Sequence, residues 1–154
     1  MKYGQHILLL AEGNATIKEK MNISQGQENL FILATKGNIV IEKAVGEEAS
    51  ARTSTDLDGI YSSQKNIIIE GNGDAASDSD PNEDLQLIVG GSLIANALNP
   101  FQGTASGGKI DVRRSLCSKN ADFPILKVVN RFDFLTQLSD FYKTRTRRLQ
   151  EIAP

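Results

Sequence analysis

The sequence predicts an all-β chain, a short right-handed parallel β-helix of four to five coils with a C-terminal capping α-helix. Similar strand-and-turn phrases start at residues 13, 37, 65 and 91, so successive starts are 24, 28 and 26 residues apart. Each phrase holds short apolar runs bounded by Gly and Asn, which favours strands over helices. A repeat of this kind is typical of a parallel β-helix, in which coils stack and share one core. An antiparallel β-sandwich, which also uses short strands and Gly turns, is the alternative.

The expected strands follow the apolar runs in chain order. The first three units pair residues 7–11 with 16–23, 30–34 with 39–41, and 58–63 with 66–70. In the fourth unit, we expect Gly90-Gly91 to be a turn between two short strands. Residues 109–113 alternate as a strand, and 125–129 form either a last strand or the entry to a helix.

Two polar segments interrupt the units. Residues 46–58 are polar and are expected to be a surface excursion. Residues 71–84 hold no apolar residue larger than Ala or Pro, so we expect a mobile loop that cannot bury enough surface to become ordered.

The C-terminal part has apolar residues at helical spacing instead of short strand-like runs. Phe134, Leu138 and Phe141 recur at helical spacing, and Asp133 is placed to cap the start. We expect an amphipathic helix over residues 133–150 that covers the final coil. Residues 1–123 would then form the coils and residues 124–154 the cap of the same domain.

Composition limits the function classes. The chain has 154 residues, enough for one domain, and it has no Trp. No apolar run approaches the length of a membrane span, so we expect no membrane insertion. Cys117 is the only cysteine and is expected to be a small buried hydrophobe. Residues 1–108 carry 7 basic and 14 acidic side chains (−7), whereas residues 109–154 carry 10 and 5 (+5). This asymmetry could serve self-association or an anionic partner.

Three motifs bear on binding. Residues 103–109 match the start of a phosphate-binding loop, but Ile110 stands where a hydroxyl is needed and a strand follows, so no nucleotide site is expected. The basic stretch 143–148 lacks interleaved aromatics, so no nucleic-acid site is expected. A cluster of acidic residues offers weak calcium candidates that lack the offsets of a high-affinity loop. Its members are Asp74, Asp78, Asp80, Glu83 and Asp84.

Two resemblances accompany these patterns. The phrases at 37–41 and 89–95 resemble coils of bactofilin-type and adhesin-type β-helices. Residues 87–99, the strand at 110–116 and the closing 150–154 resemble the C-terminal end of large uncharacterised surface proteins of candidate-phyla bacteria. The second resemblance implies an extracellular, non-enzymatic module within a longer protein.

These observations together predict a structural or adhesive module of a bacterial surface protein, with no cofactor, which binds itself or a surface polymer. An intracellular self-assembling β-helix scaffold is the alternative, so a cytoplasmic setting stays open. A polysaccharide-processing enzyme is less favoured, because it would need paired carboxylates or a Lys–carboxylate pair in a sugar-sized groove.

Overall fold

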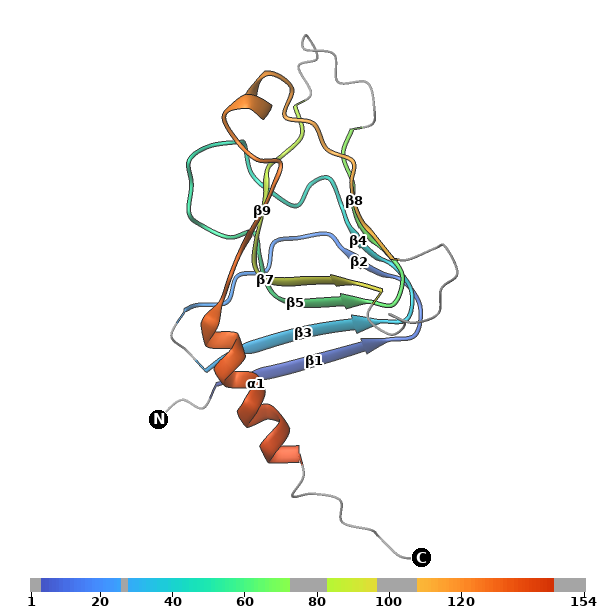
Figure 1. The fold of residues 1–154 in the computed structure, drawn as a ribbon, viewed down its shortest axis with the longest axis vertical. Coiled ribbons are helices and arrows are strands. Elements are labelled where there is room, and N and C mark those ends of the chain that lie inside the picture. The colour runs from blue at the N-terminus through green and yellow to red at the C-terminus, as the bar shows by residue number, and fades with distance from the viewer. Residues whose placement is uncertain (1–3, 26–27, 73–82, 97–107, 146–154) are drawn as a thin grey trace, which may run out of the picture.

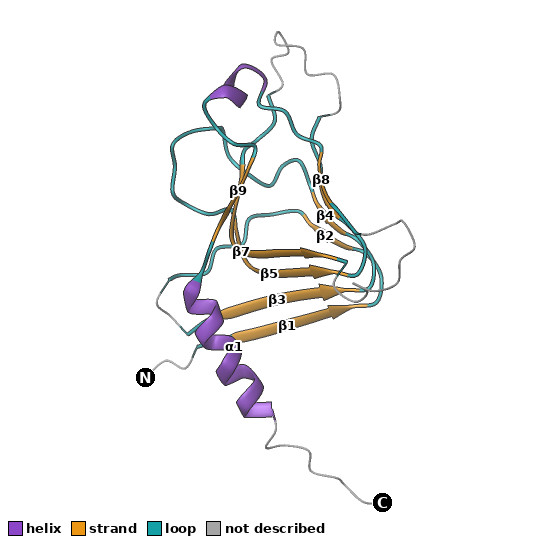
Figure 2. Cartoon of the chain, in the orientation of Figure 1, coloured by secondary structure: helices purple, strands orange, loops and turns teal. Residues whose placement is uncertain are grey.

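The computed structural model describes residues 4–25, 28–72, 83–96 and 108–145. These residues form two all-parallel sheets and one C-terminal helix (Figures 1 and 2). The first sheet has the order β1 (His6–Ala11), β3 (Leu30–Thr35), β5 (Leu57–Ser63), β7 (Leu87–Ala95) and β9 (Leu126–Val129). The second has the order β2 (Ala15–Ile17), β4 (Ile39–Ile41), β6 (Ile67–Ile69) and β8 (Ile110–Val112). A 3-10 helix, Cys117–Ala121, and α1, Phe132–Arg145, complete the elements.

This arrangement confirms the all-β class and the repeat. Each of the first four strands of the first sheet is followed by one of the second, and each unit stacks on the one before. The core between the sheets is apolar and contains Phe31, Leu33, Ile39, Ile41, Leu57, Tyr61, Ile67, Ile69, Leu87 and Val89. Because the paired strands of both sheets are parallel, the antiparallel sandwich is excluded for these strands.

An asparagine ladder sets the corner between the two sheets. The backbone N–H of Asn38 donates to Asn14 Oδ1 (2.9 Å), that of Asn66 to Asn38 Oδ1 (3.0 Å), and that of Lys109 to Asn66 Oδ1 (3.1 Å). Each side-chain oxygen thus satisfies a backbone donor that the turn leaves without a strand partner. The ladder gives a physical reason for the Gly-Asn phrases seen in the sequence.

The fourth unit departs from the prediction. Residues 87–95 form one continuous strand, β7, and Gly90-Gly91 is not a turn. Gly91 lies opposite Gly59 of β5 and has φ 129°, a conformation that suits glycine. The second strand of this unit is β8, which pairs with β6. The Gly-Gly pair resembles a turn in sequence, but its role is a close approach between two strands.

The segment 46–58 is also more than a surface excursion. Asp56 is fully buried, and β5 begins at Leu57. Arg52 donates two hydrogen bonds to the Asp56 carboxylate, at 2.9 and 2.7 Å. This polar segment therefore contains a buried ion pair, which holds the segment against the sheet.

The helix begins one residue earlier than expected and its position differs from the predicted cap. It leaves β9 and contacts β3, and in Figure 1 it passes the beginnings of β3 and β1. Phe134 is buried, and His6 of β1 is hydrogen-bonded to Gln137. The described helix therefore lies across the first sheet near the early units, not over the final one. The side chain of Phe141 and residues 146–150 lie outside the described part.

Candidate interaction surface

The first strand, β1, stands at one edge of the first sheet. Three of its large apolar side chains are exposed: Ile7 by 47%, Leu9 by 50% and Leu10 by 74%. Such side chains are rarely left together in water on the edge of a sheet, because an exposed apolar edge invites pairing with another chain. This edge is therefore the first candidate for an interaction surface.

A comparison with β3 shows why these side chains are exposed. Ile7 and Leu9 are in register with Phe31 and Leu33, which are each only 7% exposed. The side chains at paired positions of a parallel sheet point to the same face. The difference is that β3 has a strand on both sides, whereas in the described part of the chain β1 has a strand only on one.

The space between the sheets is open at this end. A hollow of about 700 Å³ lies beside β1 and β2. Its apolar lining includes Leu9, Leu10, Ala11, Ala15, Ile17, Met21, Phe31 and Leu33, and Lys18, Glu19 and Lys20 also line it. We call β1 together with this hollow the N-terminal end surface. Its lining is mostly apolar, like the core between the two sheets.

Backbone groups of β1 also face outward. The N–H of Leu30 donates to Gln5 O, and that of Lys36 donates to Ala11 O, so the odd-numbered residues of β1 are bonded to β3. Peptide groups alternate in direction along a strand, so the N–H and C=O groups of Leu8 and Leu10 point away from β3, to the edge of the sheet. These groups can pair with a strand of another molecule.

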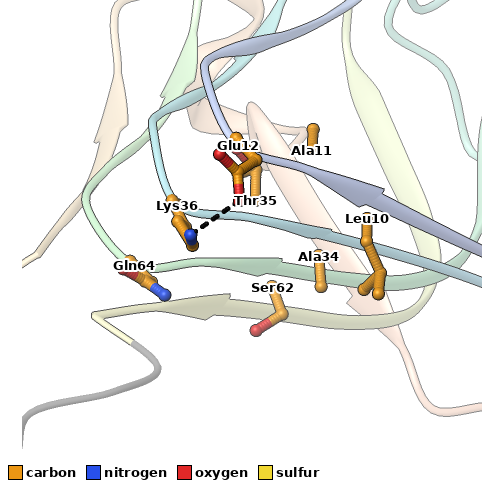
Figure 3. A pocket seen from close by; sticks show the side chains of 8 residues that line it. All are labelled: Leu10, Ala11, Glu12, Ala34, Thr35, Lys36, Ser62 and Gln64. Atoms are coloured by element: carbon orange, nitrogen blue, oxygen red, sulfur yellow. Dashed lines mark hydrogen bonds and ion pairs between the residues drawn. The ribbon is translucent and has the colours of Figure 1, made fainter.

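A groove crosses the outer face of the first sheet near the ends of β1, β3 and β5 (Figure 3). It is lined by Leu10, Ala11, Glu12, Ala34, Thr35, Lys36, Ser62 and Gln64, and its volume is about 460 Å³. We call it the outer groove. Glu12 and Lys36 form an ion pair of 2.8 Å at its rim, with exposed side chains. This is one of several Lys–carboxylate pairs among the described residues, and its two charges already neutralise each other.

The opposite end of the stack has a different shape. The four residues of β9 pair with residues 87–90 of β7, so β9 lies beside only the beginning of that strand. The remaining residues of β7, Gly91–Ala95, continue past it. This end is stepped, whereas the edge of β1 runs alongside the whole of β3.

Buried charges lie at the corners of the stack, where they hold the backbone. Arg114 donates to the carbonyl oxygens of Glu42, Val45, Glu70 and Leu85 at 2.8–2.9 Å. Burial lowers the pKa of this guanidinium, opposed by the nearby carboxylates of Asp84 and Asp56. Since main-chain oxygens occupy the donors of this guanidinium, Arg114 is a structural clamp for the backbone. It is not available to a ligand.

A second buried pair fastens the helix. The guanidinium of Arg131 is 3.2 Å from the carboxylate of Asp58 and 2.6 Å from that of Asp133, and its Nη1 donates to Ile23 O. It also lies 4.4 Å from the centre of the Phe134 ring. The contacts with Asp58 in β5 and with Ile23 position the start of α1.

The acidic calcium candidates are only partly described. Asp74, Asp78 and Asp80 lie outside the described residues. Asp84 accepts hydrogen bonds from the backbone N–H groups of Asn72 and Ser115, and Glu83 is paired with Lys119 at 2.7 Å. In the described part of the chain no group of three or more His, Cys, Asp or Glu side chains is arranged to hold a metal. The prediction of weak calcium candidates therefore stays untested.

Other predicted features are partly placed. Cys117 is buried, as expected. Of the phosphate-loop resemblance only Gly108 and Lys109 are described, and strand β8 follows them. The side chains of the basic stretch 143–148 all lie outside the described part of the chain. Sequence reasoning missed the N-terminal end surface, although the apolar run at residues 7–10 without charge could have indicated it.

The comparisons with known proteins add no family. No family model matches the chain, and no match was found among the curated proteins or the solved structures. Of the described helices, none has the length and apolar character needed to cross a membrane.

Proposed function

We propose that this chain is a non-enzymatic structural module, a short right-handed parallel β-helix that works by associating through its N-terminal end surface. The stacked parallel units support the first part of this proposal. The exposed apolar edge and the open hollow support the second. The buried arginines support a structural role, because Arg114 and Arg131 are occupied by internal contacts.

One observation carries the proposal. Leu9 and Leu33 share a register position, yet Leu9 is 50% exposed and Leu33 is 7% exposed. Covering the edge of β1 with another strand would bury Leu9 as Leu33 is buried. Burying apolar surface contributes about 25 cal/mol per Å², so burial of the three exposed side chains of β1 would contribute favourably to the free energy of association.

The setting of the module stays a proposal taken from the resemblance. A bacterial cell surface, within a longer protein, is the leading setting, and an intracellular scaffold is the alternative. Both settings need a surface that binds another molecule, and the N-terminal end surface supplies one in either case.

Sedimentation of the purified chain over a range of protein concentrations tests the proposal. We expect the mass of the wild-type protein to rise with concentration, and this rise to persist at high salt because apolar burial drives it. Leu10→Lys places a charge at the most exposed apolar position of β1 and should keep the chain monomeric. Val128→Lys is a matched control, since Val128 is 49% exposed on β9 at the other end.

Two results would contradict the proposal. A wild-type chain that stays monomeric at every concentration would remove the association itself. An effect of Val128→Lys as large as that of Leu10→Lys would show that the N-terminal end is not the surface responsible.

A further inference from the structure

We infer that the molecule bound at the N-terminal end surface is a second copy of this chain, related by a two-fold axis that passes through Leu9 of β1. In this dimer the two β1 strands pair antiparallel and join the first sheets of both copies into one. The inference rests on the proposed function and specifies its partner and geometry.

The hydrogen-bonding groups of β1 suit this pairing. Leu8 and Leu10 point their backbone groups away from β3, to the edge of the sheet. With the axis at Leu9, Leu8 of one copy lies opposite Leu10 of the other. Residues placed opposite each other in this way exchange two hydrogen bonds in an antiparallel pair. The edge is therefore complementary to itself on both sides of Leu9.

The side chains also match across the axis. Ile7, Leu9 and Ala11 face the space between the sheets, because they are in register with Phe31, Leu33 and Thr35. An axis perpendicular to the first sheet keeps these side chains on the same face in both copies. Leu9 then meets Leu9 of the second copy, and the two open hollows face each other.

A head-to-tail arrangement is disfavoured by the shape of the two ends. The start of β1 carries α1 against it, through the hydrogen bond between His6 and Gln137 (3.2 Å). At the other end, β9 covers only the beginning of β7 and leads directly into α1. A head-to-tail contact would bring the helix of one copy onto the protruding β9 of the next. The two-fold arrangement brings two straight edges together.

The helix and the outer groove support the same geometry. Figure 1 shows that α1 continues past the edge of β1 after crossing the beginning of the strand. The outer groove lies at the other end of β1, on the outer face of the sheet (Figure 3). Because the two β1 strands run in opposite directions, the two-fold axis places the overhanging end of α1 over the outer groove of the second copy. The backbone of the partner's α1 thus lies over the groove lined by Leu10, Ala34 and Ser62.

Disulfide trapping tests the position of the axis. In a Cys117→Ala background, Leu9→Cys should form a covalent dimer on mild oxidation. Residues at such a position have Cα atoms about 4.5 Å apart, within the range of about 4.4–6.8 Å that disulfides span. Ile7→Cys is the matched control, because its two copies would lie four residues apart along the strands, about 13 Å, and should not cross-link.

Ser62→Lys tests the helix in the groove. Ser62 lies in β5, two strands from the edge, so the substitution leaves the β1 pairing intact. We expect the dissociation constant of the dimer to rise at least tenfold, whereas Val128→Lys should leave it unchanged. An unchanged dissociation constant for Ser62→Lys overturns this arrangement.

The outcomes separate the inference from the proposed function. A species that stops at a dimer and cross-links through position 9 supports the inference. A wild-type chain that associates without cross-linking at position 9, or that grows into open-ended oligomers, overturns the inference and leaves the proposed function standing. A wild-type chain that remains monomeric overturns both.

Discussion

Gly91 shows how a single residue supports the stacking of two units. Its φ of 129° suits glycine, and a Cβ added there would lie 2.0 Å from the carbonyl oxygen of Gly59 on the neighbouring strand. Neither the backbone conformation nor the contact leaves room for a side chain. We expect Gly91→Ala to lower the free energy of unfolding by at least about 2 kcal/mol, measured by urea denaturation.

Gly13→Ala is the control for this prediction. A Cβ at Gly13 would meet no atom within 4 Å, so its stability should change little. Equal effects of the two substitutions would show that the close approach of β5 and β7 is not what requires Gly91.

Arg114 provides a second test at the residue scale. Its guanidinium serves four main-chain carbonyl oxygens from three separate segments. Lysine keeps the charge but cannot reproduce the planar fork of donors. Arg114→Lys should therefore cost about 3 kcal/mol or more of unfolding free energy, because buried carbonyl groups lose their donors.

The neighbouring residue is a matched control for Arg114. Arg113 has a side chain that is 53% exposed and pairs with Asp111 at the surface. Arg113→Lys should change the unfolding free energy by less than about 0.5 kcal/mol. If Arg114→Lys lowers the unfolding free energy no more than Arg113→Lys does, Arg114 does not clamp the backbone.

At the scale of elements, α1 is fastened by charge as well as by apolar contact. The hydrogen bonds from Arg131 lower the pKa of Asp133 below its usual value of 3.8, and partial burial opposes this shift only in part. Because the folded pKa is lowered, the carboxylate stabilises the fold above pH 3.8. This stabilisation is lost as the pH falls through the folded pKa.

The resulting prediction concerns Asp133→Asn. At pH 7 the substitution should lower the unfolding free energy by about 1–2 kcal/mol, and near pH 2 the difference from the wild type should nearly vanish. Urea denaturation at both pH values measures it, with Asp122→Asn as a control at an exposed carboxylate. A difference that stays the same at both pH values would show that the ion pair does not fasten the helix.

The elements also show what can be read from sequence. Apolar runs between Gly and Asn located almost every strand, because a core between two parallel sheets needs alternating buried residues at each unit. The Gly90-Gly91 pair was misread because glycine permits both a turn and a close approach, and only the opposite strand, at Gly59, decides between them. The buried pair of Arg52 and Asp56 was missed because hydrophobicity alone marks both residues as exposed.

At the scale of the whole molecule, the repeat predicts the stack, whereas the contacts between distant segments decide its ends. The stripe of Phe134 and Leu138 predicted a covered helix face, and Phe134 is buried. Its location near β1 and β3, instead of the final unit, depends on Arg131 reaching Asp58, which no local pattern reveals. The N-terminal end surface was unforeseen for a similar reason, since Leu9 is exposed because β1 has a strand on only one side among the described residues.

Amide hydrogen exchange on β1, followed by NMR at increasing protein concentration, tests the central claim most directly. The N–H groups of Leu8 and Leu10 point to the free edge, whereas those of Ile7 and Leu9 are bonded to β3. We predict that exchange at Leu8 and Leu10 slows as the concentration rises, in step with the increase in mass. Exchange at these two amides that stays fast while the mass increases would show that the molecules associate elsewhere, and would contradict the account.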